Sequence, residues 1–348
     1  MNNNKISVGV LGATGSVGQK FISLLENHPF FEITEIAASD RSAGKKYFEA
    51  VNWLEDKFIP TDVRDLTVKS CSENFNSKVL FSALDASVAG EIEEDLAKKG
   101  HIVISNAKNH RFSPNVPLII PEVNPDHLSL VKFQNYGSGC IVTNPNCSTI
   151  GLVLSLAPLH KQFGIKHLNV VTMQAISGAG YPGIPSVDMI DNIIPFIGGE
   201  EEKLEKEPNK ILGVLQNNQI TNANITISAQ TNRVFVKDGH TETVQINFEN
   251  KPSKEDILEI WQNFKSIPQH LDLPFAPKQP IIYLDDPRYP QPRLHRNVDK
   301  GMAAVTGRLR ECNLFDWKYI VLSHNTIRGA AGGTILIAEL MYKQGYIE

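Results

Sequence analysis

The first thirty residues contain a glycine loop between an apolar run and an amphipathic segment. Residues 5–11 are rich in apolar side chains, and three glycines follow at three-residue spacing from Gly12 to Gly18. Apolar residues then recur at helical spacing as far as Leu25. A strand, a glycine loop and a helix in this order are typical of dinucleotide-binding folds, because glycine lets the backbone approach the phosphates. A tight turn without a ligand is the alternative for the same loop.

Strands and helices continue to alternate as far as residue 143. Further strands are predicted at residues 31–38, 79–84, 101–105, 118–124 and 141–143, and a helix at residues 88–99. With the first run they make about six strands. Strands that alternate with helices favour a parallel α/β sheet with right-handed connections. We therefore expect a Rossmann-like, doubly wound parallel sheet in residues 1–146.

Longer β-rich segments dominate the second half of the chain. They lie at residues 168–176, 225–236, 241–248, 302–309 and 318–323, with helices at about residues 148–160, 201–215 and 253–264. This order predicts an α+β domain with a mainly antiparallel sheet in residues 147–327. The total length of 348 residues also favours two domains, because it exceeds what one core usually serves.

Two further segments of the second half are not predicted to be strands of this sheet. Residues 328–348 begin with small residues and continue as an amphipathic helix, which we expect to return to the first domain, beside the cofactor. Residues 286–293 are rich in proline and too long to be a turn. They form either a lobe or an interface arm.

Composition excludes several classes of function. The net charge is −4 and the hydrophobic share is 41%, which indicates a soluble globular protein and gives no reason to expect nucleic acid or a membrane as a partner. No apolar run reaches the length of a membrane span, and the N-terminus lacks the apolar core of a signal peptide. Four cysteines without paired short spacing predict neither a disulfide scaffold nor a metal site. We expect a cytoplasmic protein that binds small molecules and no metal.

A cysteine follows the last predicted strand of the first domain. A β-branched run ends before Pro145, and Cys147 precedes an amphipathic pattern. Proline disfavours helix in the residue before it, so a helix is expected to begin near Cys147, with Ser148 or Thr149 as its cap. A thiol at a helix start can ionise near neutral pH, and the thiolate is a nucleophile. A small buried cysteine is the alternative.

The loop after the second predicted strand bears on the choice of cofactor. An acidic residue at this place usually binds the ribose diol of NAD, whereas arginine with hydroxyl groups accommodates the extra phosphate of NADP. Asp40 is of the first kind, and Ser39, Arg41 and Ser42 are of the second. The balance favours NADP, and a solvated loop charge is the alternative for Arg41.

Several motifs occur in an order that covers nearly the whole chain. They are the loop Gly12–Gly18, residues 121–124, 144–149 and 174–180, Arg233 with Gly239–His240, and the tail 325–333. Together they resemble the aspartate-β-semialdehyde dehydrogenase family, and residues 192–203 and 210–213 are similar to its fungal and archaeal branch. The resemblance implies NADPH-dependent reductive dephosphorylation of L-4-aspartyl phosphate. The products would be L-aspartate-4-semialdehyde and phosphate, on the route to lysine, threonine and methionine.

The resemblance assigns the chemistry to three residues. Cys147 matches the nucleophile that displaces phosphate and forms a thioester, which remains electrophilic toward hydride. His240 matches the acid–base residue, and an unperturbed imidazole titrates in a useful range. Arg233 matches the arginine that binds the α-carboxylate of the substrate, for which a planar bidentate donor is suited. A surface ion pair is the alternative for Arg233.

Five further residues match substrate contacts of the family. Gln174 would orient the substrate, and Arg111 would receive the substrate phosphate. Asn146 could hold substrate or cofactor phosphate. Glu200 would bind the substrate ammonium, and Lys203 would bind phosphate. An ordinary amide at a strand end is the alternative for Gln174. Glu200 is followed by two more glutamates, so the register that places one of them at the substrate is ambiguous.

The cofactor contacts implied by the resemblance lie in both halves of the chain. They are Gly12, Thr14, Gly15, Ser16, Val17, Ser39, Arg41, Ser42, Ser82, Ser177, Gly178 and Asn325, which would bind NADP. Asn325 would contact the nicotinamide amide. The family also implies a homodimer or homotetramer, formed through the β-rich second domain.

Three other functions fit part of the pattern. Malonyl-CoA reductase, or another cysteine-dependent reductase of an acyl phosphate or acyl thioester, resembles the same archaeal branch. N-acetyl-glutamyl-phosphate reductase shares the chemistry, but its motif has glycine before the cysteine, where this chain has Asn146. A catalytically silent NADP-binding sensor is the third possibility, and the joint presence of Cys147, His240, Arg233 and Gln174 argues against it.

Overall fold

The computed structural model describes residues 5–348, and these residues divide into two compact units. The first unit comprises the described residues up to Ile119, together with Asp126–Asn144 and Ala331–Glu348. The second comprises Ile120–Pro125 and Pro145–Ala330. Neither unit is one continuous piece of chain.

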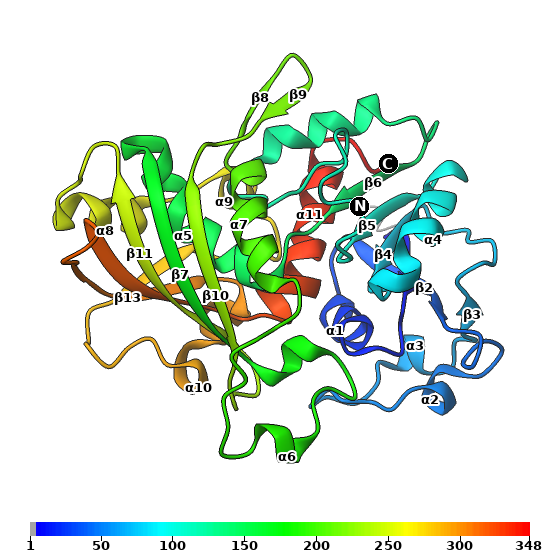
Figure 1. Ribbon diagram of the computed structural model, residues 1–348. Coiled ribbons are helices and arrows are strands. Elements are labelled where there is room, and N and C mark those ends of the chain that lie inside the picture. Colours follow the sequence, from blue (N-terminus) through cyan, green and yellow to red (C-terminus); the bar gives the residue numbers. More distant parts are fainter. Residues whose placement is uncertain (1–4) are drawn as a thin grey trace. The chain divides into compact units, whose positions relative to one another are not determined.

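The first unit is built on a six-stranded sheet with the order β3-β2-β1-β4-β5-β6. Its strands are β1 (Ile6–Leu11), β2 (Phe31–Ala38), β3 (Lys69–Ser70), β4 (Val79–Ser82), β5 (Ile102–Ser105) and β6 (Cys140–Thr143), as Figure 1 shows. Every pairing is parallel, and the strand order reverses beside β1. The predicted Rossmann-like parallel sheet is therefore confirmed.

The expected sixth strand at residues 118–124 is wrong. Leu118 makes only an isolated parallel bridge to Thr143, and the short β3 takes the sixth place beside β2. Pro117 and Pro121 bracket the run. Because proline has no backbone N–H to donate to a ladder, the pairing cannot extend in either direction.

Helices of very different lengths complete the first unit. They are α1 (Ser16–Leu25), α2 (Tyr47–Ala50), α3 (Thr61–Arg64), α4 (Ala86–Lys98) and α11 (Gly332–Lys343), with 3-10 turns over Pro125–Phe133. The helix expected at residues 88–99 begins two residues earlier, at Ala86. The cause is Asp85, whose carboxylate accepts a hydrogen bond from the Ser87 N–H and caps the helix.

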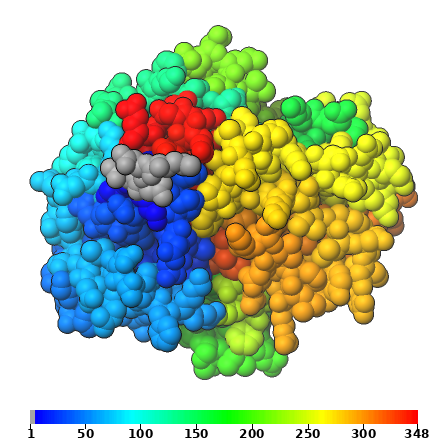
Figure 2. Space-filling model, turned by 180° about the vertical axis from the view of Figure 1, so that it is seen from behind, coloured from blue at the N-terminus to red at the C-terminus, as the bar shows by residue number. Residues whose placement is uncertain are grey.

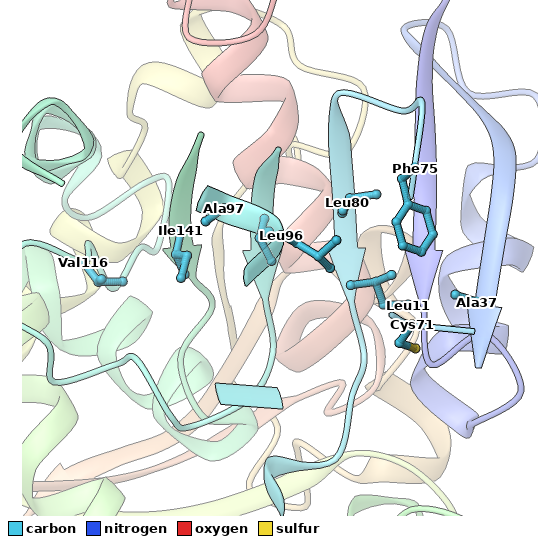
Figure 3. Close-up of a cluster of buried hydrophobic side chains, with 10 residues drawn as sticks. Leu11, Ala37, Cys71, Phe75, Leu80, Leu96, Ala97, Val116 and Ile141 are labelled. Atoms are coloured by element: carbon cyan, nitrogen blue, oxygen red, sulfur yellow. The ribbon is translucent and has the colours of Figure 1, made fainter. Parts of the chain in front are cut away.

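Apolar side chains of the sheet and of α4 form the core of the first unit. Leu11, Leu80 and Ile141 come from three strands and share one cluster with Leu96 of α4. Figure 3 shows Leu96 beside the strand that carries Leu80. Burial of each such side chain stabilises the fold by about 1.5–3 kcal/mol.

The C-terminal helix α11 packs within the first unit, against β5 and α1. Its residues from Gly332 to Met341 are buried. Two polar contacts also hold it: Thr334 donates to Asn106 at 3.0 Å, and Glu339 lies 2.8 Å from the His28 Nε2. The last segment of the chain therefore completes the core that the first segment begins.

The glycine loop between β1 and α1 is fixed by close backbone packing. Gly12 has a φ of +73°, and a Cβ there would meet the Ala83 carbonyl oxygen at 2.5 Å. A Cβ on Gly18 would meet the Gly12 carbonyl oxygen at 2.2 Å. The buried Gln19 side chain donates to the Thr14 carbonyl at 2.9 Å and holds the outer part of the loop.

The second unit is built on a six-stranded sheet with the order β10-β7-β11-β14-β13-β12. Its strands are β7 (Ile165–Gln174), β10 (Thr226–Arg233), β11 (His240–Phe248), β12 (Ile281–Leu284), β13 (Ala304–Glu311) and β14 (Trp317–Ser323). The long strands β7, β10 and β11 lie side by side, as Figure 1 shows. The three central pairings are antiparallel and the two edge pairings are parallel. The predicted mainly antiparallel sheet is confirmed.

Helices cover part of this sheet. They are α5 (Cys147–Phe163), α6 (Ser186–Met189), α7 (Glu200–Ile211), α8 (Lys254–Asn263), α9 (Ile267–His270) and α10 (Pro292–His295), with 3-10 turns at Ile176–Ala179 and Val298–Gly301 and a π turn at Ile327–Ala331. The long helix α5 packs on β7, β11, β13 and β14 and is buried from Ser148 to Leu156. It is therefore the centre of the second unit.

The helix expected to reach residue 215 ends at Ile211. Residues after it form a hairpin of β8 (Val214–Gln216) and β9 (Gln219–Thr221). Asn217 and Asn218 both have positive φ, which is the backbone that two-residue hairpin turns require.

The proline-rich residues 286–293 follow β12 and include the first two residues of α10. They belong to the segment coloured yellow to orange, from α8 to about residue 300, which forms a continuous surface on the face seen in Figure 2. Among residues 5–348, every helix is too short or too polar to cross a membrane.

Replacing Gly18 by alanine tests the close packing of the loop. We expect Gly18→Ala to lower the free energy of unfolding by about 1–3 kcal/mol, because the new methyl group overlaps the Gly12 carbonyl. The loss should outweigh the helix preference of alanine, which is about 1 kcal/mol. Urea unfolding measures the effect. Gly15→Ala is the matched control, since its Cβ would meet only the Gly12 carbonyl, at 3.4 Å. Equal stability of the two variants would contradict the packing argument.

Candidate active site

Cys147 is the first residue of α5 and follows Pro145 and Asn146 directly. Asn146 caps the helix, because its side-chain oxygen accepts a hydrogen bond from the Ser148 N–H at 3.0 Å. The expectation of Ser148 or Thr149 as the cap is therefore wrong, since the helix begins before them. The thiol stands where the unpaired N–H groups of a 17-residue helix concentrate positive potential.

His240 faces the cysteine from the first position of β11. Its Nε2 lies 3.2 Å from the Cys147 Sγ, and its Nδ1 accepts a hydrogen bond from the Ala175 N–H at 3.0 Å. The ring is 1% exposed. Burial first, then the charges of Arg233 and His324, lowers the pKa of His240 to about 3. The ring is therefore neutral around the sulfur at ordinary pH.

Arg233 ends β10 and pairs in register with Gln174 at the end of β7. This parallel pairing brings the two polar side chains to the same edge of the sheet. The Arg233 Nη1 donates to the Ala175 carbonyl at 2.7 Å, which fixes the guanidinium. Its buried Nε has no hydrogen-bond partner among residues 5–348. A carboxylate would satisfy this N–H and use the planar fork of the guanidinium.

Glu200 is the first residue of α7. Its carboxylate accepts hydrogen bonds from Asn146 Nδ2 at 2.9 Å and from Gln174 Nε2 at 3.4 Å, and pairs with Lys203. Burial acts to raise the pKa of Glu200, but Lys203, Asn146 and Gln174 outweigh it and hold the pKa below its usual value. Glu202 instead forms an exposed pair with Lys206.

A second carboxylate near the cysteine was not predicted. Glu207, about two turns beyond Glu200 along α7, is fully buried, and its Oε2 accepts a hydrogen bond from the Asn146 N–H at 2.7 Å. Lys210 is buried beside it, and burial lowers the pKa of Lys210 to about 8. Residues 200, 203, 207 and 210 lie on one face of α7, because their spacing follows the helical period. This spacing of charged residues was the signal by which Glu207 could have been found in the sequence.

Arg111 lies in the first unit, after β5. It is 5% exposed, and its Nη2 donates to the Asn106 carbonyl at 2.8 Å. The structure thus holds the guanidinium at the carboxyl end of a parallel strand, where such sheets bind ligands.

Glu93 was also missed by the sequence analysis. It projects from α4, is fully buried, and its Oε1 accepts hydrogen bonds from Ser82 at 2.6 Å and Ser105 at 2.7 Å. His110 Nε2 lies 3.7 Å from its Oε2. Burial raises the pKa of Glu93, against the hydrogen bonds of the two serines. The hydroxyl of Ser82, a residue expected to contact the cofactor, therefore donates its hydrogen bond to Glu93.

The glycine loop of the first unit fits the phosphates of a dinucleotide. Gly15 precedes α1 as its N-cap residue, and no side chain caps the first-turn N–H groups of Ser16 and Val17. A Cβ on Gly15 would extend into open space and meet only the Gly12 carbonyl. The amides at this helix start thus have no side-chain cap and can donate to an anion.

The residues expected to select the nucleotide follow β2. Ser39 and Arg41 are exposed and Ser42 is half-buried. Asp40 is also exposed, and its carboxylate accepts a hydrogen bond from the Ser70 hydroxyl at 2.8 Å. Ser39, Arg41 and Ser42 therefore form the polar surface at the end of β2. Asp40 lies beside them in the chain, and its carboxylate is already hydrogen-bonded to Ser70.

The remaining expected cofactor residues, Ser177, Gly178 and Asn325, lie in the second unit. Asn325 donates to the Ser177 hydroxyl at 2.8 Å and accepts from the Gly239 N–H at 2.8 Å. Its amide thus ties the turn before His240 to the turn at Ser177. A Cβ on Gly178 would meet the Arg233 Nη1 at 2.8 Å and the His240 Cε1 at 3.1 Å.

A buried ion pair supports the cysteine from the tail of the second unit. Arg328 donates to both carboxylate oxygens of Glu122, at 2.8 and 2.6 Å, and both side chains are fully buried. Gly329 follows, and a Cβ there would meet the Cys147 Cα at 2.9 Å. The glycine-rich tail was predicted, but neither its contact with Cys147 nor the ion pair was.

The arrangement can carry out acyl transfer. A sulfur at a helix start faces an imidazole, a guanidinium with an unused N–H lies at the adjacent strand end, and Glu200 supplies a carboxylate beside Asn146. Among the described residues, no group of three or more histidine, cysteine, aspartate or glutamate side chains is placed to hold a metal ion.

Removing one partner of the buried ion pair should destabilise the fold strongly. We expect Glu122→Ala to lower the free energy of unfolding by about 3–5 kcal/mol, because it leaves the Arg328 charge buried without compensation. Urea unfolding gives the value. Glu202→Ala is the control, since it removes a carboxylate from the exposed pair with Lys206 and should change stability little. An equally small loss in both variants would show that the buried pair is not required.

Comparisons with known proteins agree with this geometry. A family described as Semialdehyde dehydrogenase, NAD binding domain, matches residues 7–131, and one described as Semialdehyde dehydrogenase, dimerisation domain, matches residues 156–328. An aspartate-semialdehyde dehydrogenase of Archaeoglobus fulgidus is 48% identical over 99% of this chain and 100% of its own length. That of Saccharomyces cerevisiae is 48% identical over 100% of both chains.

A solved structure gives the same result for the fold. Aspartate semialdehyde dehydrogenase from Candida albicans, determined with NADP, has a TM-score of 0.91 and 44% sequence identity, covering 98% of this chain and 99% of that one. Sequence, fold and the order of the site motifs therefore agree over the whole length of the chain. This chain belongs to the aspartate-semialdehyde dehydrogenase family.

Proposed function

We propose that this chain reduces L-4-aspartyl phosphate to L-aspartate-4-semialdehyde and phosphate with NADPH, on the route to lysine, threonine and methionine. The observation that carries the proposal is the placement of Cys147 at a helix start, 3.2 Å from His240. The relatives named aspartate-semialdehyde dehydrogenase, at 48% identity over the full length, support the same reaction.

Acylation of Cys147 is the first chemical step in this proposal. The sulfur attacks the carbonyl carbon of the acyl phosphate, and the bond from that carbon to the phosphate oxygen breaks. NADPH, when bound, supplies the hydride that reduces the resulting thioester. Cys147 then leaves as the thiolate and releases the aldehyde. The positive potential of the α5 start favours the anionic sulfur both as nucleophile and as leaving group.

Other side chains of the second unit hold the substrate in the proposal. Arg233 binds the α-carboxylate through its unused Nε–H and its fork, and Glu200 attracts the substrate ammonium. Gln174 and Asn146 orient the substrate, and both already donate to Glu200. Each of these amides is therefore fixed before the substrate arrives, which lowers the entropy cost of positioning it.

Cations receive the phosphate in the proposal. Lys203 pairs with Glu200, and Arg111 is held by the Asn106 carbonyl at the end of β5. Each of these two side chains can offer charge-assisted hydrogen bonds to a dianion. This part rests on the family resemblance together with the buried position of Arg111.

NADP is the proposed cofactor, with Gly12, Thr14, Gly15, Ser16 and Val17 at its phosphates. Support comes from the uncapped start of α1, and from the Candida albicans relative, whose structure was determined with NADP. Arg41 with Ser39 and Ser42 would bind the extra phosphate of the ribose, while Ser82, Ser177, Gly178 and Asn325 would lie along the rest of the cofactor. We also propose residues 1–146 with 328–348 as the cofactor domain and residues 147–327 as the catalytic and dimerisation domain.

The rival functions have less support. The curated relatives in the comparison carry the name aspartate-semialdehyde dehydrogenase, which favours aspartyl phosphate over malonyl-CoA. A silent sensor would not need Cys147 beside His240, or Arg233 and Gln174 at the same edge of the sheet.

We further propose that the protein acts in the cytoplasm. The four cysteines, all within the described residues, form no disulfide, as is usual for proteins of a reducing compartment.

The reverse reaction tests the proposed function directly. Purified protein is mixed with aspartate semialdehyde, phosphate and NADP, and the absorbance of reduced nicotinamide is followed. We expect phosphate-dependent reduction of NADP, slower reduction of NAD, and no reduction by Cys147→Ala. NADP binding by that variant, measured by calorimetry, should persist, because the cofactor contacts are elsewhere. No signal from folded protein with either cofactor would contradict the proposal.

Arg233→Lys tests the role of the guanidinium. We expect a higher KM for aspartate semialdehyde and a lower kcat, because the point charge of lysine cannot reproduce a bidentate contact. Steady-state kinetics of the reverse reaction provide both constants. Arg293→Lys, an exposed change in the same unit, should leave them unaltered. Unchanged constants for Arg233→Lys would remove this residue from the substrate site.

The homodimer or homotetramer is a proposal supported by the family description, in which residues 156–328 match a dimerisation domain. We expect size-exclusion chromatography with light scattering to give twice or four times the chain mass of 38.6 kDa. A monomer mass across the accessible concentration range would overturn it.

A further inference from the structure

We propose that Glu201 is a positioning residue: it fixes α7 to the edge of β10 and thereby sets the spacing between Glu200 and Arg233. These two side chains receive the ammonium and the carboxylate of the substrate in the proposed function, and the inference rests on that function for the two ends of the substrate. It goes further because it assigns a task to the second of three consecutive glutamates.

The free edge of the second sheet is closed by α7. β10 pairs with β7 on one side only, and an edge strand presents a row of backbone groups on its other side. Here the Thr231 N–H donates to the Glu201 carboxylate at 3.1 Å, and the Ala229 N–H donates to the Glu205 carboxylate at 3.2 Å. The helix thus takes the place that another strand would occupy.

The same row of backbone groups is bound at both of its ends. Asn209 of α7 accepts a hydrogen bond from the Ile225 N–H at 2.9 Å and donates to the Ile225 carbonyl at 3.0 Å. At the other end, Arg233 and Ile194 exchange two backbone hydrogen bonds, at 2.8 and 3.1 Å. The helix is therefore fixed along the strand, and Arg233 is fixed in its backbone as well as through its side chain.

The two faces of α7 have different partners. The side chains that bind β10 share one face, at four-residue spacing, and they are Glu201, Glu205 and Asn209. The opposite face carries Glu200 and Glu207, whose carboxylates bind the side chain and the backbone N–H of Asn146. A rotation of α7 about its axis would move both faces together. The contacts with β10 therefore also determine where Glu200 points.

The contact of Glu201 is a short connection between the two ends of the substrate site. Glu200 precedes Glu201 in the chain, and Arg233 follows Thr231 by two residues. One hydrogen bond, from the Thr231 N–H to Glu201, thus joins the helix that carries the carboxylate to the strand that carries the guanidinium. The two groups are also close in space: burial lowers the pKa of Arg233, and the charges of Cys147 and Glu200 act against this effect.

The chemistry of the substrate makes this spacing important. In an α-amino acid the ammonium and the carboxylate are attached to one carbon, so covalent geometry fixes their separation. A carboxylate and a guanidinium bind both groups only if they keep a matching separation, and a misplacement of about 1 Å can cost as much as 10²-fold in rate. A hydrogen bond that ties helix to strand beside both groups therefore acts on the substrate without touching it.

Steady-state kinetics of the reverse reaction test the proposal in Glu201→Ala. We expect the KM for aspartate semialdehyde to rise about tenfold with a much smaller change in kcat, because the variant weakens binding of the amino-acid end. The KM values for phosphate and NADP should stay within about twofold of the parent, since neither ligand uses the paired charges. A role in stability alone would leave all three KM values unchanged, and a similar rise in all three would indicate general damage. Either result would overturn the proposal.

Two variants of the same helix serve as controls. Glu201→Gln keeps an oxygen that can accept the hydrogen bond from the Thr231 N–H, so it should bring the KM for aspartate semialdehyde back to within about threefold of the parent. Glu202→Ala removes the neighbouring carboxylate, which is exposed and paired with Lys206, and should leave this KM unaltered. An equal rise in Glu201→Ala and Glu202→Ala, or no recovery in Glu201→Gln, would contradict the assigned role.

Hydrogen exchange tests the contact itself and needs no substrate. Exchange of the backbone amides in the full-length protein is followed by mass spectrometry in peptides that cover residues 226–233. We expect faster exchange in Glu201→Ala than in the parent and in Glu202→Ala, because the Thr231 N–H loses its acceptor. Equal exchange in all three proteins would show that Glu201 does not fix α7 to β10, and the proposal would fall.

The outcomes separate this proposal from the proposed function. Failure of the parent protein to reduce NADP with aspartate semialdehyde would overturn the substrate, and with it the meaning of the spacing between Glu200 and Arg233. The exchange result would still decide whether Glu201 holds α7 on β10. Turnover by the parent, with an unchanged KM in Glu201→Ala, would instead keep the function and remove the positioning role.

Discussion

One residue without a functional side chain, Ala175, orients the chemistry of the second unit. Its N–H donates to His240 Nδ1 and its carbonyl accepts from Arg233 Nη1. Because the N–H of a residue can only donate and its C=O can only accept, the two side chains are set by backbone geometry and not by each other. Ala175 directly follows β7, and the register of β7 with β10 and β11 places it, so the sheet itself determines where the imidazole and the guanidinium point.

The start of α5 is held in a comparable way by two carboxylates. Glu200 binds the side chain of Asn146 and Glu207 binds its backbone N–H, while the Asn146 oxygen caps the helix. Every polar group of this one asparagine is thus engaged before a ligand arrives. Two anions close to a nucleophilic thiol would ordinarily oppose its ionisation, and here Lys203 and Lys210 on the same face of α7 offset them.

The parts of the site that depend on residues close together in the sequence could be predicted. The glycine loop, the turn before Cys147 and the alternation of strands are recognised from neighbouring residues alone. Glu93, Glu207 and the pair of Glu122 with Arg328 were missed, because each acts on a partner between 11 and 206 residues away. Ala175 could not have been singled out by residue type, since its function belongs to the backbone. The short strand β3 was missed because two residues leave no periodicity to detect.

The place of α11 in the first unit has a consequence for how the chain folds during synthesis. Residues 332–341 are buried against β5 and α1, so the first unit lacks part of its core until nearly the whole chain has left the ribosome. The second unit, whose residues end at Ala330, is complete earlier. An N-terminal domain usually folds first during synthesis, but the core of this one cannot be completed before the C-terminal helix is available.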